Sequence, residues 1–156
     1  MNQTKMAALT LRCTYRRLRL TYGIAAFLAF LAGVIIYVFF RNPDIVLFQI
    51  IPKPAFFTMR NFSVSADTVP MSMLLFNVPD GLWFLSGLLA IRAVWLTNQK
   101  WRLIYFVLFM VIAFTMEISQ IFEGVAGTFD VFDMVFMAFF AFVESIIFNI
   151  FIRRSV

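Results

Sequence analysis

The chain has 156 residues, of which 63% are hydrophobic and 13% are charged, with a net charge of +5. A soluble domain carries about a quarter charged residues, so a chain this apolar has too little polar surface to stay dissolved in water. The composition excludes an ordinary soluble domain. It indicates an all-α, polytopic membrane helical bundle with about four transmembrane helices in one domain over residues 1–156.

Several common kinds of site lack the residues they need. The chain has no histidine, which excludes haem ligation by histidine, a Ser-His-Asp triad and the usual zinc sites. We therefore expect no metal and no cofactor. Cys13 is the one cysteine, so no intramolecular disulfide can form. The basic residues lie at the ends of apolar runs and lack a soluble platform, so we expect no nucleic-acid binding.

The first expected span covers residues 23–40 and follows a basic segment. At about 1.5 Å per residue it is about 27 Å long, close to the thickness of the hydrocarbon layer. The residues after it, 41–44, read RNPD and contain no small-residue cleavage site. This pattern favours an uncleaved membrane anchor over a signal peptide.

Residues 41–78 are predicted to form an external loop. Pro52 and Pro54 break any helix there, and the apolar stretches are too short to cross a bilayer. The loop is expected to lie on the membrane, with room for a short interfacial helix. The next span is expected over 79–96, because Pro79 and Asp80 suit the first turn of a helix. The last two spans are expected over 103–122 and 129–152.

The connections between the spans differ in charge. Lys or Arg residues occur in the N-terminal segment, in the 97–102 loop and at the C-terminus, but not in the 123–128 turn. Positively charged short loops stay on the cytoplasmic side. The pattern predicts that the N-terminus and the C-terminus are both cytoplasmic, in what we expect to be a bacterial cytoplasmic membrane.

Acidic residues inside the last two spans are energetically unfavourable in a membrane, so we expect each of them to have a specific role. Glu117 and Asp133 lie at similar depth, about 7.5 Å and 6 Å from the outer ends of consecutive antiparallel helices. Residues three positions away on a helix share a face, and Asp80 opens the preceding helix on the same side. The spacing predicts one outward-facing acidic pocket, lined by Asp80, Glu117, Gln120, Asp130 and Asp133.

This pocket has a functional and a structural interpretation. It could bind a cationic group, a metal ion or a lipid headgroup at the outer leaflet. Carboxylates held close together also favour proton uptake and release. In the structural interpretation, Asp80 and Asp130 cap helices, and protonated Glu117 ties the bundle together. Because Glu117 and Asp133 need not lie so deep merely to cap a helix, we favour a binding role for that pair.

Arg92 and Glu144 lie nearer the inner side of the expected bundle, and two interpretations of them stay open. They could form an ion pair inside the membrane, since each charge needs a partner there. Alternatively, Arg92 extends its side chain to the cytoplasmic headgroups. Neither interpretation makes the pair catalytic.

The acidic motifs, in their order, resemble those of the VanZ-like family of small integral membrane proteins. The resemblance is carried by residues 117–120 (EISQ), 127–133 (GTFDVFD) and 77–83 (NVPDGLW). It covers about residues 75–145. The arginine that often precedes the Asp-x-x-Asp pair in the family is replaced here by Ala126-Gly127-Thr128. The resemblance implies a role at the cell envelope, where the namesake is associated with resistance to teicoplanin, but it implies no reaction.

Three functions compete at this point. The first is a VanZ-like envelope protein that binds a membrane lipid or a lipid-linked headgroup in the acidic pocket. The second is an accessory or structural subunit, held to a membrane-protein partner or to further copies of itself by its many apolar faces. The third is a lipid-directed enzyme, which would need a nucleophile or a metal that the sequence does not identify.

Overall fold

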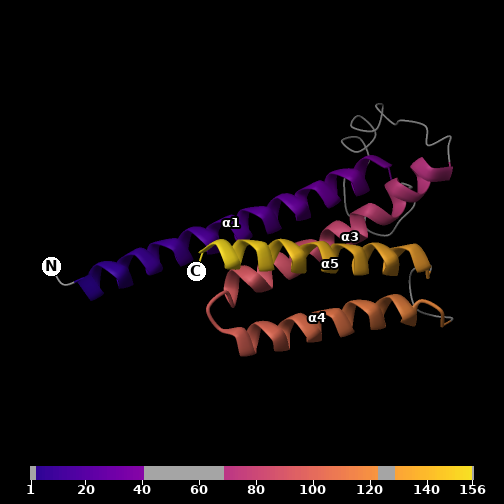
Figure 1. The fold of residues 1–156 in the computed structure, drawn as a ribbon. Helices are drawn as coiled ribbons and strands as arrows, with labels where there is room; N and C mark the ends of the chain where they lie inside the picture. The colour runs from indigo at the N-terminus through magenta and orange to yellow at the C-terminus, as the bar shows by residue number, and fades with distance from the viewer. Residues whose placement is uncertain (1–2, 41–68, 123–128, 156) are drawn as a thin grey trace, which may run out of the picture.

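The computed structural model describes residues 3–40, 69–122 and 129–155, and almost all of them are helical (Figure 1). The helices are α1 (Gln3–Phe40), α3 (Val69–Val94), α4 (Gln99–Ser119) and α5 (Val131–Ser155). The described part of the chain contains no β-strand. The expected all-α fold is therefore confirmed.

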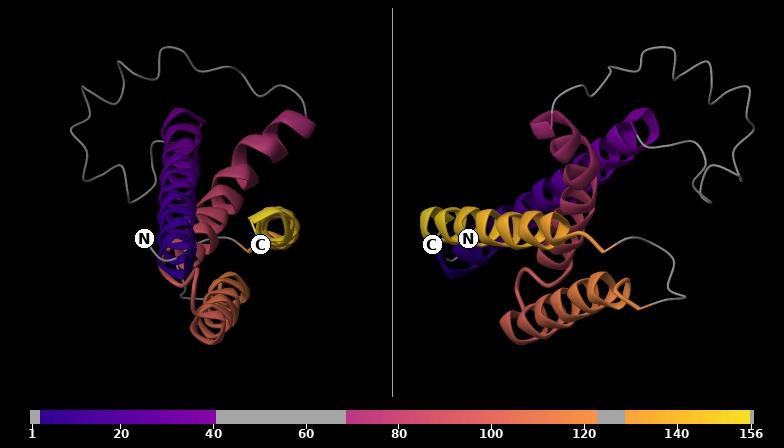
Figure 2. Two further views of the ribbon diagram at one scale, coloured as in Figure 1. Left: turned by 60° about the vertical axis from the view of Figure 1, so that its left-hand side comes forward. Right: turned by 90° about the vertical axis from the view of Figure 1, so that its right-hand side faces the viewer.

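Helix α3 is the centre of the arrangement, because it contacts α1, α4 and α5. The remaining helices surround it, as the two turned views show (Figure 2). Successive helices run in opposite directions, so the two ends of the chain lie at the same end of the molecule (Figure 1). The end of α4 and the start of α5 lie at the opposite end.

Two apolar clusters hold these helices together. In the first, buried Phe84 and Leu88 of α3 meet Met137 and Ala141 of α5, with side chains of α4 packed against them. The ring of Phe84 stacks on that of Phe109 of α4, with centroids 5.3 Å apart. The second cluster lies nearer the chain termini and joins α1, the α3–α4 connection and α5 through Tyr22, Leu96 and Phe148.

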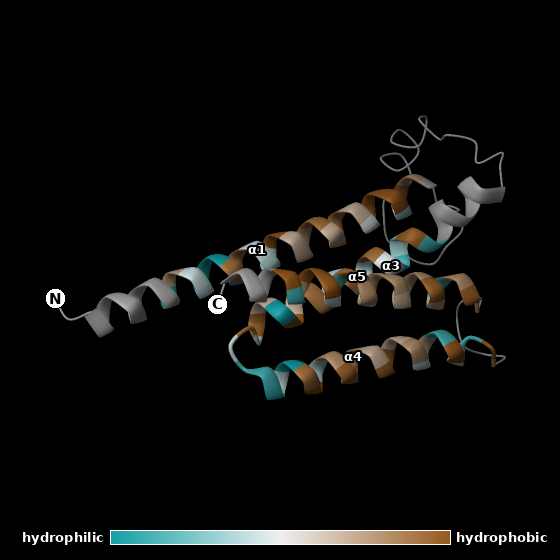
Figure 3. Cartoon of the chain, viewed as in Figure 1, coloured by the Kyte–Doolittle hydropathy of each residue, from teal (hydrophilic) through white to brown (hydrophobic). Residues whose placement is uncertain are grey.

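Hydrophobic residues make up most of the described helices (Figure 3), and many of them are exposed. Large side chains such as Phe27, Leu103 and Phe142 are 62%, 62% and 65% exposed. Within the described residues, three stretches are long and apolar enough to cross a membrane: Arg12–Phe39, Gln99–Ser119 and Val131–Ile150. An apolar exterior of this extent suits a lipid environment, which is consistent with a membrane protein.

Helix α3 is not among these three stretches. The search for such stretches covered only the described side chains of α3, which include the polar Asn77, Asp80 and Arg92. Two of these side chains bond to residues of α5 or of the connection before it. The polar groups of α3 therefore serve contacts with other helices, while the other three helices present apolar surface outward.

The start of α3 differs from the sequence-based prediction. Pro79 and Asp80 were expected to open this helix, but α3 begins at Val69 and Pro79 is buried inside it. The prediction failed because a proline removes only one hydrogen bond, a loss that membrane helices tolerate when neighbouring helices surround them. The remainder of the expected external loop, 41–68, and the expected turn at 123–128 lie outside the described residues.

Candidate functional site

The five residues expected to line an acidic pocket lie at one end of the bundle, contributed by three helices. Asp80 comes from α3, Glu117 from the last turn of α4, and Asp133 from the first turn of α5. Gln120 is the C-cap of α4, and Asp130 immediately precedes α5. The end of α4 and the start of α5 are neighbours in space (Figure 1). The matched depth of residues on antiparallel helices thus places the carboxylates together.

Asn77 of α3 links two of these carboxylates. Its side-chain amide donates to Asp130 Oδ2 at 2.8 Å and to Asp133 Oδ1 at 2.9 Å. Asn77 and Asp133 are buried, with 3% and 8% of their surfaces exposed. A side-chain amide has two N–H donors, and both are used here to join α3 to the start of α5.

Glu117 makes a second link, between α4 and the segment before α5. Its Oε2 accepts a hydrogen bond from Gln120 Nε2 at 3.1 Å, and its Oε1 accepts one from the backbone N–H of Asp130 at 3.1 Å. Glu117 is 6% exposed. It therefore fixes the end of one helix against the beginning of the next without an arginine or lysine.

Asp130 and Asp80 have different local roles. Asp130 caps α5, because its Oδ1 accepts a hydrogen bond from the backbone N–H of Phe132 at 2.9 Å, as an N-cap residue does. The expectation that Asp130 caps a helix is met. The same expectation for Asp80 is wrong, since α3 begins at Val69 and Asp80 lies well inside it.

Negative charge is concentrated at this site. Asp80, Glu117 and Asp130 all lie close enough to Asp133 for their charges to repel it. The hydrogen-bond donors to Glu117 and Asp133 in the described part of the chain are neutral amides, so these contacts add no positive charge beside the carboxylates. A proton or a cationic group that entered the site would relieve this repulsion.

The residues of the site differ in exposure. Glu117 and Asp133 are buried, whereas Asp80, Gln120 and Asp130 are partly exposed. Among the residues that the structure describes, no group of three or more acidic, histidine or cysteine side chains has an arrangement that could hold a metal ion.

Arg92 and Glu144 meet deeper in the bundle, away from the acidic site. Arg92 Nε lies 2.7 Å from Glu144 Oε1, and Arg92 Nη2 lies 3.0 Å from Glu144 Oε2. The Glu144 side chain is 1% exposed and that of Arg92 is 11% exposed. The Arg92 guanidinium also lies 3.7 Å from the centre of the Phe148 ring. Of the two interpretations, the structure has the ion pair and not an extended Arg92.

Sequence reasoning missed the role of Asn77. A signal was present, because Asn77 precedes Asp80 by three residues and so shares its helix face. Asn77 was instead assigned to the external loop, since Pro79 was taken as the first residue of the helix. The predicted start of α3 thus decided whether Asn77 was included in the acidic site.

Comparisons with known proteins found no family model, no curated protein and no solved structure that matches the chain.

Proposed function

We propose that the chain is a VanZ-like integral membrane protein of the cell envelope, which binds a lipid or a lipid-linked headgroup at the acidic site. The bound part of the headgroup is its cationic group. The observation that supports this most directly is that two buried carboxylates, Glu117 and Asp133, are held by neutral amides while two more carboxylates lie beside them.

The contrast with Arg92 and Glu144 supports a binding role. Where the bundle needs a buried carboxylate for structure alone, it supplies an arginine in two-point contact. Burying a charge without an opposite charge is expensive. At the acidic site, no arginine or lysine among the described residues bonds to Glu117 or Asp133, and carboxylates in such surroundings are common at functional sites.

The position of the site fits a headgroup. Glu117 is two residues from the end of α4, and Asp133 is the third residue of α5. Both lie within one helical turn, about 5.4 Å, of the helix ends. In our proposal α3 also crosses the bilayer, both termini are cytoplasmic, and the site therefore opens to the outer leaflet of what we take to be a bacterial cytoplasmic membrane.

The test is purification in a gentle detergent, followed by mass spectrometry of the lipids and proteins that accompany the chain. The unchanged protein is compared with Glu117→Gln/Asp133→Asn, which keeps the shape of both side chains and removes their charge. We expect a specific lipid with a cationic headgroup to be enriched with the unchanged protein and lost from the double variant. Equal recovery of that lipid with both proteins would contradict the proposal.

A second function, as an accessory subunit of a membrane complex, is favoured by the surface of α4. Exposed side chains there surround a shallow apolar hollow of about 410 Å³, lined by Leu103, Ile104, Val107, Leu108 and Val111. The same mass spectrometry distinguishes the two functions. A stoichiometric protein partner retained by the double variant, with no specific lipid, would favour the subunit.

A further inference from the structure

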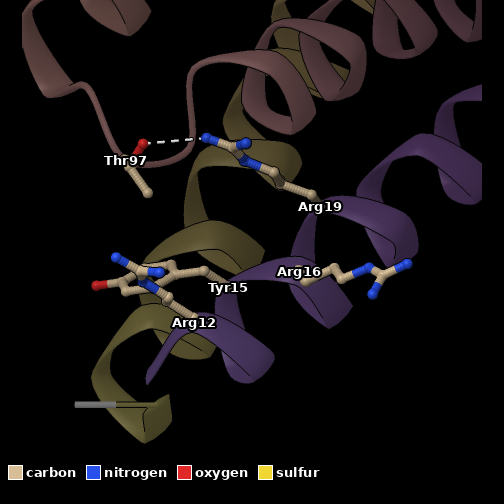
Figure 4. Close-up of a pocket in the computed structure, with 5 residues that line it drawn as sticks. All are labelled: Arg12, Tyr15, Arg16, Arg19 and Thr97. Carbon is tan, nitrogen blue, oxygen red and sulfur yellow. Dashed lines mark hydrogen bonds between the residues drawn. The ribbon is translucent and has the colours of Figure 1, made fainter. Parts of the chain in front are cut away.

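A groove with basic walls lies between the N-terminal half of α1 and the connection between α3 and α4. It has a volume of about 270 Å³ and is lined by Arg12, Tyr15, Arg16, Arg19 and Thr97. The four residues of α1 follow one another at intervals of three, one and three positions, so they share one face of the helix. Thr97 forms the opposite wall, and Figure 4 shows the groove in close-up.

One contact across the groove fixes its shape. Arg19 Nη2 donates a hydrogen bond to Thr97 Oγ1 at 3.1 Å (Figure 4). Directly beside the groove, buried Tyr22 of α1 and Leu96 of the α3–α4 connection pack in the same apolar cluster. The two walls are therefore held together by packing as well as by the hydrogen bond.

The groove offers donors suited to an anion. A guanidinium has five N–H donors, of which the contact with Thr97 uses one. Arginine binds phosphate oxygens through two parallel hydrogen bonds, and the hydroxyl groups of Tyr15 and Thr97 can each donate one more. In Figure 4 the guanidinium groups of Arg12 and Arg19 lie on the side of Thr97, whereas that of Arg16 points away from them. Two guanidinium groups beside one hollow suit the charge of a phosphate group.

The position of the groove along α1 indicates where the phosphate comes from. Arg19 precedes Gly23, the first residue of the continuous apolar stretch, by four residues, or about 6 Å along the helix. Each headgroup layer of a bilayer is about 5–8 Å thick. If α1 crosses the membrane, the Arg19 end of the groove lies in a headgroup layer, at the end of the molecule opposite to the acidic site.

We propose that this groove binds the phosphate of one anionic phospholipid in the cytoplasmic leaflet. The proposal depends on the membrane location of the chain but not on the acidic site. The proposed site differs from a general attraction between basic residues and anionic lipids. Only some of the basic residues in this segment line the groove. Arg17 is exposed, lies on the same helix and is not among the lining residues.

The test compares Arg19→Gln with Arg17→Gln, each of which removes one positive charge from the same segment. Full-length protein is placed in nanodiscs of phosphatidylcholine mixed with phosphatidylglycerol, and bound lipids are counted by native mass spectrometry. We expect one retained phosphatidylglycerol per chain. Arg19→Gln should weaken its binding by about fivefold or more, the effect of one basic residue near a membrane surface. Arg17→Gln should leave the binding close to that of the unchanged protein.

Two further measurements use a conservative variant and a soluble competitor. Arg19→Lys keeps the charge but loses the two-point geometry, so binding should fall between that of the unchanged protein and that of Arg19→Gln. Glycerol 1-phosphate is added as a soluble competitor, and it should displace the lipid poorly. Glu117→Gln/Asp133→Asn should retain phosphatidylglycerol, which separates this proposal from the proposed function.

Three results would overturn the proposal. Equal weakening by Arg17→Gln and Arg19→Gln would show a diffuse electrostatic attraction. No retained phosphatidylglycerol on the unchanged protein would show that the groove binds no lipid. Efficient displacement by glycerol 1-phosphate would show a site for a soluble phosphate instead of a lipid. Size-exclusion chromatography of each variant checks that it is folded.

Discussion

Side chains at the acidic site have two roles. In our proposal they bind a ligand, and they also connect neighbouring helices. Asn77 holds Asp130 and Asp133 through one amide, and Glu117 holds the start of α5 through the backbone of Asp130. Removing a charge and removing a hydrogen-bond donor should therefore have different effects. Loss of a charge should weaken ligand binding, and loss of a hydrogen-bond donor should lower the free energy of unfolding.

Asn77→Leu should destabilise the protein, because it removes the donor shared by buried Asp133 and partly exposed Asp130. The expected loss in the free energy of unfolding is about 1.5–3 kcal/mol, the range for a hydrogen bond to a charged group. Ser119→Ala is the control, since the Ser119 hydroxyl bonds the carbonyl of Met116 at an exposed position, and such changes stay within about 0.5 kcal/mol. Detergent-based unfolding measures both, and equal effects would contradict the structural role of Asn77.

Arg92→Met should destabilise the protein more strongly, because it leaves Glu144 buried without an opposite charge. Breaking one partner of a buried ion pair costs about 3–5 kcal/mol, whereas replacing both partners by apolar residues is often neutral. Arg92→Met/Glu144→Met should therefore recover most of the lost stability. If Arg92→Met alone leaves the unfolding free energy unchanged, the ion pair is not formed in the membrane. Neither variant should change binding at the acidic site.

At the scale of helices, close approach depends on glycines that face a neighbouring element. A Cβ atom on Gly33 of α1 would lie 2.7 Å from two ring atoms of Trp83 and 3.2 Å from the backbone oxygen of Pro79. A Cβ on Gly81 of α3 would lie 2.7 Å from the ring of Phe140 on α5. Small residues at such positions let membrane helices approach one another.

Gly33→Ala should push α1 away from α3 and lower the free energy of unfolding by about 1–3 kcal/mol, as overpacking does. Gly23→Ala is a matched control on the same helix, because its Cβ would meet no atom within 4 Å. That variant should be neutral, or stabilising by up to about 1 kcal/mol from helix propensity. Unfolding of the two variants in parallel checks the prediction, which fails if both have the same stability.

The helices were predictable where apolar length alone decides them. The expected spans 103–122 and 129–152 overlap most of α4 (Gln99–Ser119) and α5 (Val131–Ser155). The start of α3 was not predictable, because a proline can either open a helix or lie inside one when neighbours surround it. The proximity of Glu117 to Asp133 followed from their matched depth, whereas the contacts of Asn77 required the continuous helix through Pro79.

At the scale of the whole molecule, the two ends of the chain lie at one end of the bundle and the acidic site at the other (Figure 1). The basic groove lies on the side of the termini, since Arg12 and Arg19 belong to the N-terminal half of α1. Within the described residues, the basic groove and the acidic site thus lie at opposite ends of the molecule. This polarity agrees with the proposed orientation, in which basic residues face the cytoplasm.

Cys13 gives a direct test of this orientation, because it is exposed and is the one cysteine in the chain. A membrane-impermeant maleimide should fail to label it in intact cells and should label it after permeabilisation. Ser119→Cys, in a Cys13→Ser background, places the thiol at the opposite end and should be labelled in intact cells. Labelling of Cys13 in intact cells would reverse the proposed topology.

The most direct measurement of the central claim is native mass spectrometry of the protein in nanodiscs of phosphatidylethanolamine or phosphatidylcholine. A primary ammonium donates hydrogen bonds to carboxylates and a quaternary ammonium does not. The proposed site therefore predicts a retained phosphatidylethanolamine that is lost in Glu117→Gln/Asp133→Asn and kept in Arg19→Gln. Equal retention of both lipids, unchanged by the double variant, would contradict a headgroup site at Glu117 and Asp133.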